Sequence, residues 1–151
     1  MALKENGNTL LIDIGHHTTT ISAFCKKLLF KTHIIPLGGK AVTFDINHYL
    51  NLGFDYRKAT WLKHQYVKLN VKDELIIHTD EFGKKFNLTY LNKIATSRIK
   101  QILQTAKEFT DDIFCDQEYD IILTGGSAQL ENINKLTEKL FTHPARVYTS
   151  K

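Results

Sequence analysis

The sequence is poor in the residues that mark secreted, fibrous or membrane-spanning chains. Its 151 residues include only two cysteines, two prolines, one methionine and one tryptophan. Cys25 and Cys115 stand far apart and lack metal-site spacing, so we expect thiols rather than a disulfide. No apolar run approaches the length of a membrane-spanning helix. No biased tract indicates a disordered linker.

Targeting and nucleic-acid signals are also missing. Residues 1–9 lack the apolar core of a signal peptide, which predicts a cytoplasmic chain. The formal net charge is +4, but no dense Lys/Arg run and no nucleic-acid motif is present, so we expect no nucleic-acid partner. The mild positive charge favours an acidic partner, a nucleotide or an anionic surface, or is simply a solvated basic face.

What is present is an ordinary globular composition, with 42% hydrophobic residues. The length is enough for one domain with a sizeable core and room for a small subdomain.

The segment Leu10–Phe24 organises the rest of the chain. An apolar run leads into Asp13 and Gly15, two histidines and three threonines follow, and the pattern then alternates again. This order predicts a β-hairpin with a polar tip. Glycine and hydroxyls at such a tip can hold a phosphate, and the carboxylate can orient Mg²⁺ or water. Taken alone, the pattern slightly favours the alternative of an ordinary hairpin with a polar turn.

Periodicity predicts the remaining elements. Residues 67–70 and 74–79 should form a short strand pair, residues 37–39 a flexible joint, and Asn87 should cap the longest helix. Other strands are expected at 28–35, 119–124 and 145–148. Helices are expected at 41–52, 56–67, 88–109 and from 130 to about 143.

Three further segments, with the hairpin, carry a family resemblance. They are HIIPLGGKAVTFDI from His33, ATWLKHQY from Ala59 and ILTGGSAQLENINKL from Ile122. In this order and at about these separations, the four segments resemble FtsA, the actin-like cell-division ATPase family of bacteria. The resemblance covers nearly the whole chain, but only the second of the two lobes of such proteins.

The resemblance implies an α/β (α+β) fold. We expect an actin-like, ribonuclease H-like lobe, in which a mixed sheet is flanked by helices. Residues 1–38 and 86–151 would form the core subdomain, and residues 39–85 a small inserted α+β subdomain.

The resemblance also implies a site for ATP and Mg²⁺. On the phosphate side, the matching Asp13 would order Mg²⁺ and water. Gly15, Thr18 and Thr19 would hold phosphate oxygens.

On the adenosine side, Lys63 would border the adenine and ribose. Gly125, Gly126 and Ser127 would pass close to the adenosine, because a side chain there would block the purine and ribose.

The chain departs from the family pattern at this site. His17 stands in place of a glycine, Thr20 in place of an aspartate and Thr60 in place of a glutamate. His16 and His17 are poorly placed as a metal pair, because adjacent strand residues point to opposite faces. They can be exposed turn residues or, when protonated, attract phosphate.

The implied function is that of an adaptor lobe with a degenerate or incomplete ATP site. It would bind the acidic C-terminal tail of FtsZ, link it to the divisome at the inner face of the cell membrane, and self-associate with actin-like subunits. No catalytic residue is assigned, and ATPase chemistry is not expected of this chain alone. No amphipathic tail follows Tyr148, so direct membrane insertion is not expected. The basic residues of the small subdomain are Arg57, Lys58, Lys63, Lys68 and Lys72.

Two alternatives remain open at this point. The chain could be the ATP-binding half of an actin-like ATPase that becomes active only with its other lobe. It could also belong to another group of actin-like assembly proteins, such as those of pilus assembly.

Overall fold

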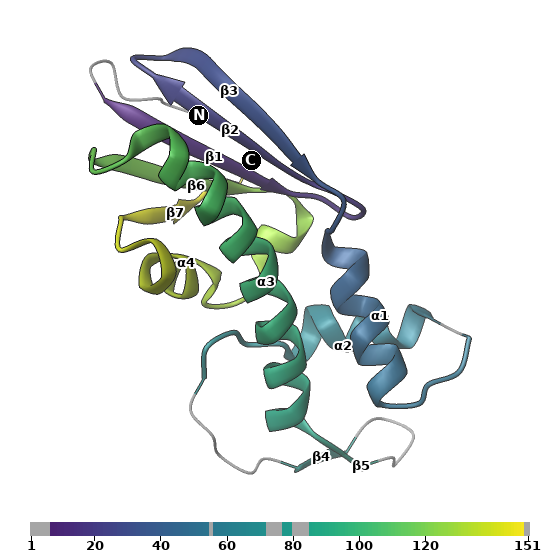
Figure 1. Ribbon diagram of the computed structural model, residues 1–151. Helices are drawn as coiled ribbons and strands as arrows, with labels where there is room; N and C mark the ends of the chain where they lie inside the picture. Colours follow the sequence, from purple (N-terminus) through teal and green to yellow (C-terminus); the bar gives the residue numbers. More distant parts are fainter. Residues whose placement is uncertain (1–6, 55, 72–76, 80–84, 150–151) are drawn as a thin grey trace.

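The computed structural model describes residues 7–54, 56–71, 77–79 and 85–149. A five-stranded sheet forms one end of the molecule, and the long helix α3 runs from this sheet towards α1 and α2 at the other end (Figure 1). A separate two-stranded sheet lies beside the amino-terminal end of α3.

The large sheet has the strand order β3-β2-β1-β6-β7. Strands β1 (Asn8–Ile14), β2 (Thr19–Cys25) and β3 (Leu28–Ile35) form an antiparallel meander. Strands β6 (Tyr119–Thr124) and β7 (Ala145–Val147) continue the sheet in parallel with β1. The sheet is therefore mixed, as expected, and both β3 and β6 coincide with the predicted strands.

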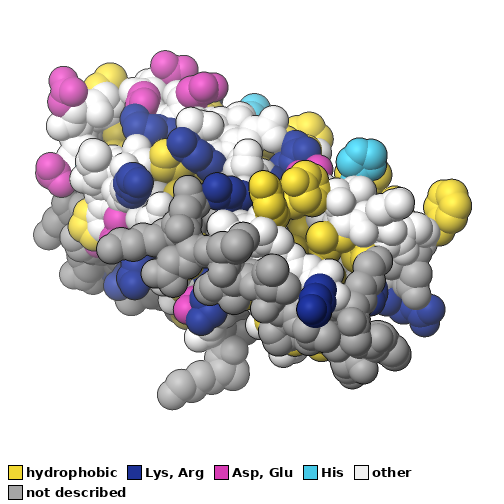
Figure 2. All heavy atoms as spheres, turned by 90° about the horizontal axis from the view of Figure 1, so that it is seen from below, with side chains coloured by type: hydrophobic (Ala, Val, Ile, Leu, Met, Phe, Trp, Pro, Cys, Tyr) yellow, Lys and Arg dark blue, Asp and Glu magenta, His cyan; other side chains and the backbone are white. Residues whose placement is uncertain are grey.

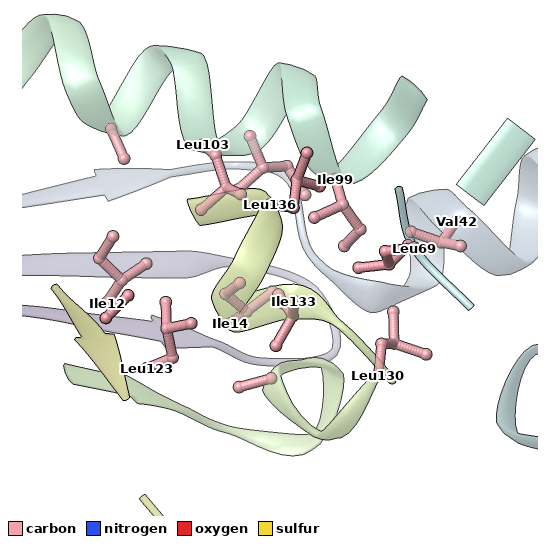
Figure 3. Packing of buried hydrophobic residues seen from close by; sticks show 14 of the residues in the cluster. Ile12, Ile14, Val42, Leu69, Ile99, Leu103, Leu123, Leu130, Ile133 and Leu136 are labelled. Carbon is pink, nitrogen blue, oxygen red and sulfur yellow. The ribbon is translucent and has the colours of Figure 1, made fainter. Parts of the chain in front are cut away.

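The core lies between this sheet and two helices, α3 (Leu88–Phe114) and α4 (Ile133–Phe141). Alternate residues of β1 face the helices and are fully buried, which is the period of two expected of a half-covered strand. Leu103 and Ile99 of α3 point from the helix towards the side of the cluster where Ile12 and Ile14 of β1 lie (Figure 3). Burial of such side chains from water is the main stabilising term of the fold.

Helix α3 begins where the sequence predicts. The side chain of Asn87 accepts hydrogen bonds from the amides of Thr89, over 2.9 Å, and Tyr90, over 3.3 Å. This satisfies two of the donors that a helix start leaves unpaired. The helix continues to Phe114, five residues beyond the predicted end, because Thr110 and Phe114 extend its buried stripe.

The remaining helices are α1 (Gly39–Tyr49) and α2 (Tyr56–Tyr66). Helix α1 ends before the predicted Leu52, and Asn51 takes the left-handed backbone conformation at φ 50°. Asparagine tolerates this conformation, so Asn51 ends the helix just after its C-cap residue Leu50.

We predicted that residues 67–70 pair with residues 74–79 as two strands, and this pairing is wrong. Strand β4 (Ile77–Thr79) pairs with β5 (Lys85–Asn87), and the first segment forms only an isolated parallel bridge from Lys68 to Glu131. The amide of Leu69 also donates to the carbonyl of Glu131 over 2.9 Å. Residues 80–84, between β4 and β5, lie outside the described residues.

Among the described helices, none combines the length and apolar character needed to cross a bilayer.

Candidate functional site

Two turns meet at one edge of the large sheet. Because β1 and β6 are parallel neighbours, Gly15, after β1, and Gly125, after β6, leave the sheet at the same edge. Gly125 has φ +92°, and a Cβ there would lie 2.5 Å from the carbonyl oxygen of Ile14 and would overlap the carboxylate of Asp13. Glycine therefore permits a close approach that any other residue would prevent.

The hairpin turn is closed by the amide of Gly15, which donates to the carbonyl of Thr18 over 3.0 Å. His16 and His17 form its tip, and neither has a positive φ. The tip therefore accepts a histidine at position 17 without backbone strain, although the family motif has glycine there.

Helix α1 begins directly against this turn. The amide of Gly39 donates to the carbonyl of Gly15 over 2.8 Å, and the amide of Lys40 donates to that of His16 over 2.7 Å. A Cβ on Gly38 would lie 2.6 Å from the carbonyl oxygen of Gly15. The glycine pair that we predicted as a flexible joint is instead buried, and its lack of side chains lets two backbone segments touch.

A second cluster lies behind the first. Lys63 of α2 is buried, and its ammonium donates to the carbonyl of Gly39 over 3.1 Å. Burial lowers the pKa of Lys63 below its ordinary value of 10.5. A Cβ on Gly39 would overlap the Oγ of Ser127, so Lys63, Gly39 and Ser127 are in mutual proximity.

The structure therefore brings together Asp13, Gly15, Lys63, Gly125 and Ser127, which sequence analysis assigned to one site. Each lies in or beside one of the two clusters.

The other three predicted residues differ from one another in exposure. Thr18 and Gly126 are exposed, and a Cβ on Gly126 would meet nothing within 4 Å. Thr19 is fully buried, and its hydroxyl donates to the carbonyl of Leu37 over 2.8 Å. In this arrangement the Thr19 hydroxyl ties the hairpin to the segment before α1.

The last helix begins later than residue 130, where we predicted its start. Residues Gly126–Gln129 form a short 3₁₀ helix, and α4 begins only at Ile133. Asn132 before α4 is left-handed, at φ 68°, so the chain changes direction between the two helices.

A hollow of about 760 Å³ opens beside the hairpin tip, between the first turns of α1 and α2. Sequence analysis did not predict this hollow, because its walls come from two different helices, α1 and α2, and no sequence motif marks them. The exposed Phe44, Tyr56 and Trp61 were the available signal, since three large aromatics outside the core need a reason. The lining residues are His16, Lys40, Thr43, Phe44, Tyr56, Arg57, Thr60 and Trp61.

Lysine side chains lie near the hairpin tip. Burial and the neighbouring His17, Lys63 and Lys40 together lower the pKa of His16 below 6.5, with burial the largest cause. A neutral imidazole next to cations is harder to protonate, so its pKa falls. An anion placed among the same groups would raise that pKa again.

The glycine-walled cradle fits a nucleotide better than it fits a metal ion. The glycine turns bring backbone segments close together, and the buried ammonium of Lys63 lies beside them. Such a surface suits a flat, polyanionic ligand. For Mg²⁺ the structure offers one carboxylate, that of Asp13, whose register partners Thr20 and Thr124 carry hydroxyls, so phosphate oxygens and water would have to complete the coordination. Within the described residues, no group of three or more His, Cys, Asp or Glu side chains could hold a metal.

An antiparallel meander extended by parallel strands, with turns meeting at one sheet edge, defines an actin-like lobe. The solved structures agree. The MreB5 protein of Spiroplasma citri bound to ADP matches 95% of this chain and 49% of its own, with a TM-score of 0.71 and 20% identity. A type IV pilus biogenesis complex of PilM and PilN matches 96% of this chain and 36% of the other, with a TM-score of 0.69 and 16% identity. These likenesses show the fold.

Sequence comparison identifies the family. The family model described as cell division protein FtsA matches residues 10–151, so the chain belongs to the FtsA family. The cell division protein FtsA of Enterococcus faecalis is 31% identical over 158 residues, and the match covers 96% of this chain. That of Bacillus subtilis is 29% identical over 151 residues, covering 95%. The chain spans about a third of the length of these curated relatives, 34% in both cases.

Proposed function

We propose that this chain works as the second lobe of an FtsA-like cell-division adaptor. The observation that carries the proposal is the meeting of the turns at Gly15 and Gly125 in a chain of the FtsA family. In this proposal, residues 1–38 and 86–151 form the core subdomain and residues 39–85 the inserted one.

The proposed partners are the C-terminal tail of FtsZ and other actin-like subunits. The lobe would link FtsZ to the divisome on the inner, cytoplasmic face of the cell membrane. Family membership supports this proposal, because the relatives that match nearly the whole chain are cell division proteins.

A basic surface on the small subdomain would receive the acidic tail. Lys58 lies on α2, and Lys68 follows this helix. The ammonium of Lys68 lies 3.2 Å from the carboxylate of Glu131, with both side chains about half exposed. Such exposed pairs contribute about 0–1 kcal/mol, so an acidic peptide can displace Glu131 at little cost.

The space-filling view shows this end of the molecule. Lys and Arg side chains are spread across the face and lie among hydrophobic ones, whereas Asp and Glu gather mostly towards one side (Figure 2). Lys72, which we included in the basic set, lies outside the described residues.

The test is binding of a synthetic FtsZ C-terminal tail peptide, measured by fluorescence anisotropy against a scrambled peptide of the same composition. The double reversal Lys58→Glu, Lys68→Glu should weaken binding by roughly ten-fold or more, because attraction becomes repulsion. The matched control is Lys135→Glu, Lys139→Glu on α4, which changes the net charge equally and should leave the affinity unchanged. Equal binding of the tail and scrambled peptides would remove the proposal.

A second candidate function has its own support. Gly39, Lys63 and Ser127 meet beside the turns at Gly15 and Gly125, so the chain could be the ATP-binding half of an actin-like ATPase. Such enzymes act by closing two walls over the ligand, which positions the reacting groups. Joining this chain to the first lobe of a full-length relative should then produce nucleotide hydrolysis. Absence of both binding and hydrolysis in the joined protein would exclude this candidate.

A further inference from the structure

Strand β3 leaves one edge of the large sheet unpaired. It forms the outer margin of this sheet (Figure 1), and within the described residues it pairs with β2 alone. The strand has eight residues, whereas β7 at the opposite edge has three. A long edge strand presents a row of backbone N–H and C=O groups with which another extended strand can pair.

The side chains of this edge are mostly apolar and lie in solvent. The exposed fractions are 75% for Leu28, 59% for Leu29, 67% for Phe30 and 59% for Ile34. A single exposed apolar side chain needs no explanation, but four on one strand form a patch of the kind that marks an interaction surface. The strand contains one charged residue, Lys31. The edge therefore combines unpaired backbone groups with an apolar surface.

The regular part of the strand presents two different faces. The ammonium of Lys31 lies 5.3 Å from the ring centroid of Phe109 on α3, and the ring of His33 stacks on the same phenyl ring at 5.2 Å. Both side chains therefore lie on the face of the sheet that α3 covers. Because side chains alternate along a strand, Thr32 and Ile34 point to the other face.

The chemistry of the edge favours an extended strand as its partner. A lipid surface cannot pair with the outward N–H and C=O groups, and open sheet edges do not occur in contact with hydrocarbon. A helix uses its backbone groups internally and leaves none along its length. A second copy of β3 supplies both the backbone groups and a matching apolar surface, and a two-fold axis places two copies of one strand antiparallel.

The sequence of β3 is complementary to itself about Thr32. With the axis at this residue, the two threonines face each other, and Ile34 of each copy lies opposite Phe30 of the other. Thr–Thr and aromatic–β-branched pairs are among the cross-strand pairs that stabilise a sheet. Lys31 then lies opposite His33, whereas an axis at Lys31 would bring the two lysines together. The two-fold arrangement about Thr32 therefore avoids a direct repulsion.

We propose that two copies of this chain associate through β3, antiparallel about a two-fold axis at Thr32, so that their two sheets join into one. The inference rests on the proposed self-association with actin-like subunits, and adds the surface that makes the contact. A β-bulge leaves Phe30 without a register partner on β2, so regular pairing between the copies covers about five residues, or roughly 17 Å. Such a small contact makes a weak dimer that depends on protein concentration.

The test is sedimentation-velocity centrifugation of the chain at roughly 10 to 500 µM, the range in which a weak dimer forms. A two-fold contact closes at the dimer, whereas head-to-tail contacts build open-ended assemblies. The proposal therefore expects a monomer–dimer equilibrium. Open-ended assembly without a closed dimer would overturn the inference and leave the proposed self-association intact. A monomer at every concentration would overturn the inference too.

Two substitutions should shift the equilibrium in opposite directions. Ile34→Lys places like charges in the joined sheet and should weaken dimerisation by roughly ten-fold or more. Lys31→Thr removes the charge that guards the edge and should strengthen dimerisation by roughly three- to ten-fold. The matched controls are Phe54→Lys and Lys139→Thr, which make the same charge changes at other exposed positions and should have no effect.

Both edge positions are exposed, so the variants should fold, which their urea midpoints will verify. Equal dimerisation of the edge variants and their controls would overturn the inference.

A disulfide tests the register. Opposite residues of antiparallel strands have Cα atoms about 4.5–5.5 Å apart, which a disulfide can span. With Cys25→Ser and Cys115→Ser in place, Thr32→Cys should form a covalent dimer under mild oxidation. Its yield should be at least roughly five-fold that of Ser97→Cys, an exposed control on α3. Equal yields would overturn the arrangement about Thr32.

Two other occupants of the edge would give different results. Binding of the chain to phosphatidylglycerol vesicles, without dimerisation in solution, would assign the edge to a lipid surface and overturn the inference. Loss of the dimer when the chain is joined to the first lobe of a full-length relative would show that the longer protein covers this edge, and would also overturn it. The FtsZ-tail assay decides the adaptor proposal independently of these results.

Discussion

The buried ammonium of Lys63, on α2, donates to the carbonyl oxygen of Gly39, at the start of α1, over 3.1 Å. The hydroxyl of Thr43 donates to the same oxygen over 3.2 Å. One carbonyl beside the hairpin tip therefore receives two side-chain donors, one from α1 and one from α2.

Lys63→Met should change the free energy of unfolding by no more than about 1 kcal/mol at neutral pH. The lost hydrogen bond is offset by removal of a buried charge, and Thr43 still satisfies the carbonyl. Urea titration measures the difference, and a loss of several kcal/mol would show that the ammonium is needed for folding.

The pH dependence of the same variant has a definite sign. Burial lowers the pKa of Lys63 in the folded chain, so between that lowered value and 10.5 the unfolded chain binds more protons. The stability contributed by Lys63 therefore rises with pH across this window, and Lys63→Met should lack the rise. Urea titrations from neutral pH to 10.5 check this, with the exposed Lys139→Met as control. Parallel curves for Lys63→Met and the unchanged protein would contradict it.

Gly39→Ala should destabilise the chain by about 1–3 kcal/mol, because the new methyl group overlaps the Oγ of Ser127. The double variant Gly39→Ala, Ser127→Ala should recover most of the loss, since the remaining Ser127 Cβ lies at 3.4 Å. Gly126→Ala, where the added atom meets nothing within 4 Å, is the control. Additive effects of the two changes, measured by urea titration, would show that the overlap is not the cause.

Gly125→Ala should be more severe, at roughly 2–4 kcal/mol. The methyl group meets the backbone carbonyl of Ile14, which cannot rotate away, and φ is +92°. Gly53→Ala separates the two causes, because Gly53 also has a positive φ, +76°, but open space around it. It should cost only about 1 kcal/mol. Equal losses for the two variants in thermal denaturation would show that conformational strain alone is responsible.

The ion pair between Asp45 of α1 and Arg98 of α3 should show a coupling energy of about 1–2 kcal/mol in a double-mutant cycle to alanine. Two parallel hydrogen bonds of 2.6 and 2.9 Å join the side chains, which are only 22% and 28% exposed. The more exposed Lys107–Asp111 pair, four residues apart on α3, is the comparison, and should give about 0.3–0.5 kcal/mol. Equal coupling in the two pairs would show that burial and bidentate geometry add nothing.

Local pattern predicted some elements residue for residue. The apolar run at Tyr119–Thr124 and the extended segment at Leu28–Ile35 are the observed β6 and β3. Asn87 caps α3 as predicted, because capping depends on residues within one helical turn. The helix ends were less predictable, since α1 and α3 are each followed by a residue with a positive φ that is not glycine, Asn51 and Cys115.

The local sequence pattern could not predict which distant segments pair with one another. The segment after α2 looks like a strand beside 74–79, but the amide of Leu69 bonds to Glu131, 62 residues away. In the same way, Gly39 at the start of α1 lies beside Ser127, 88 residues later in the chain. The two are so close that a Cβ added to Gly39 would overlap the Oγ of Ser127. The motifs identified the site residues, but their proximity follows from the parallel pairing of β1 with β6.

By itself, the sequence determined the hairpin, the alternation that buries one face of β1, and the membership of the family, because these depend on residue types at fixed short spacings. Only the tertiary structure decided that the glycines at 38 and 39 are close contacts, that the Thr19 hydroxyl is used inside the fold, and that Lys40 lines hollows beside the hairpin tip. Those relationships depend on how the helices dock on the hairpin, and docking is set by packing between segments that are far apart along the chain.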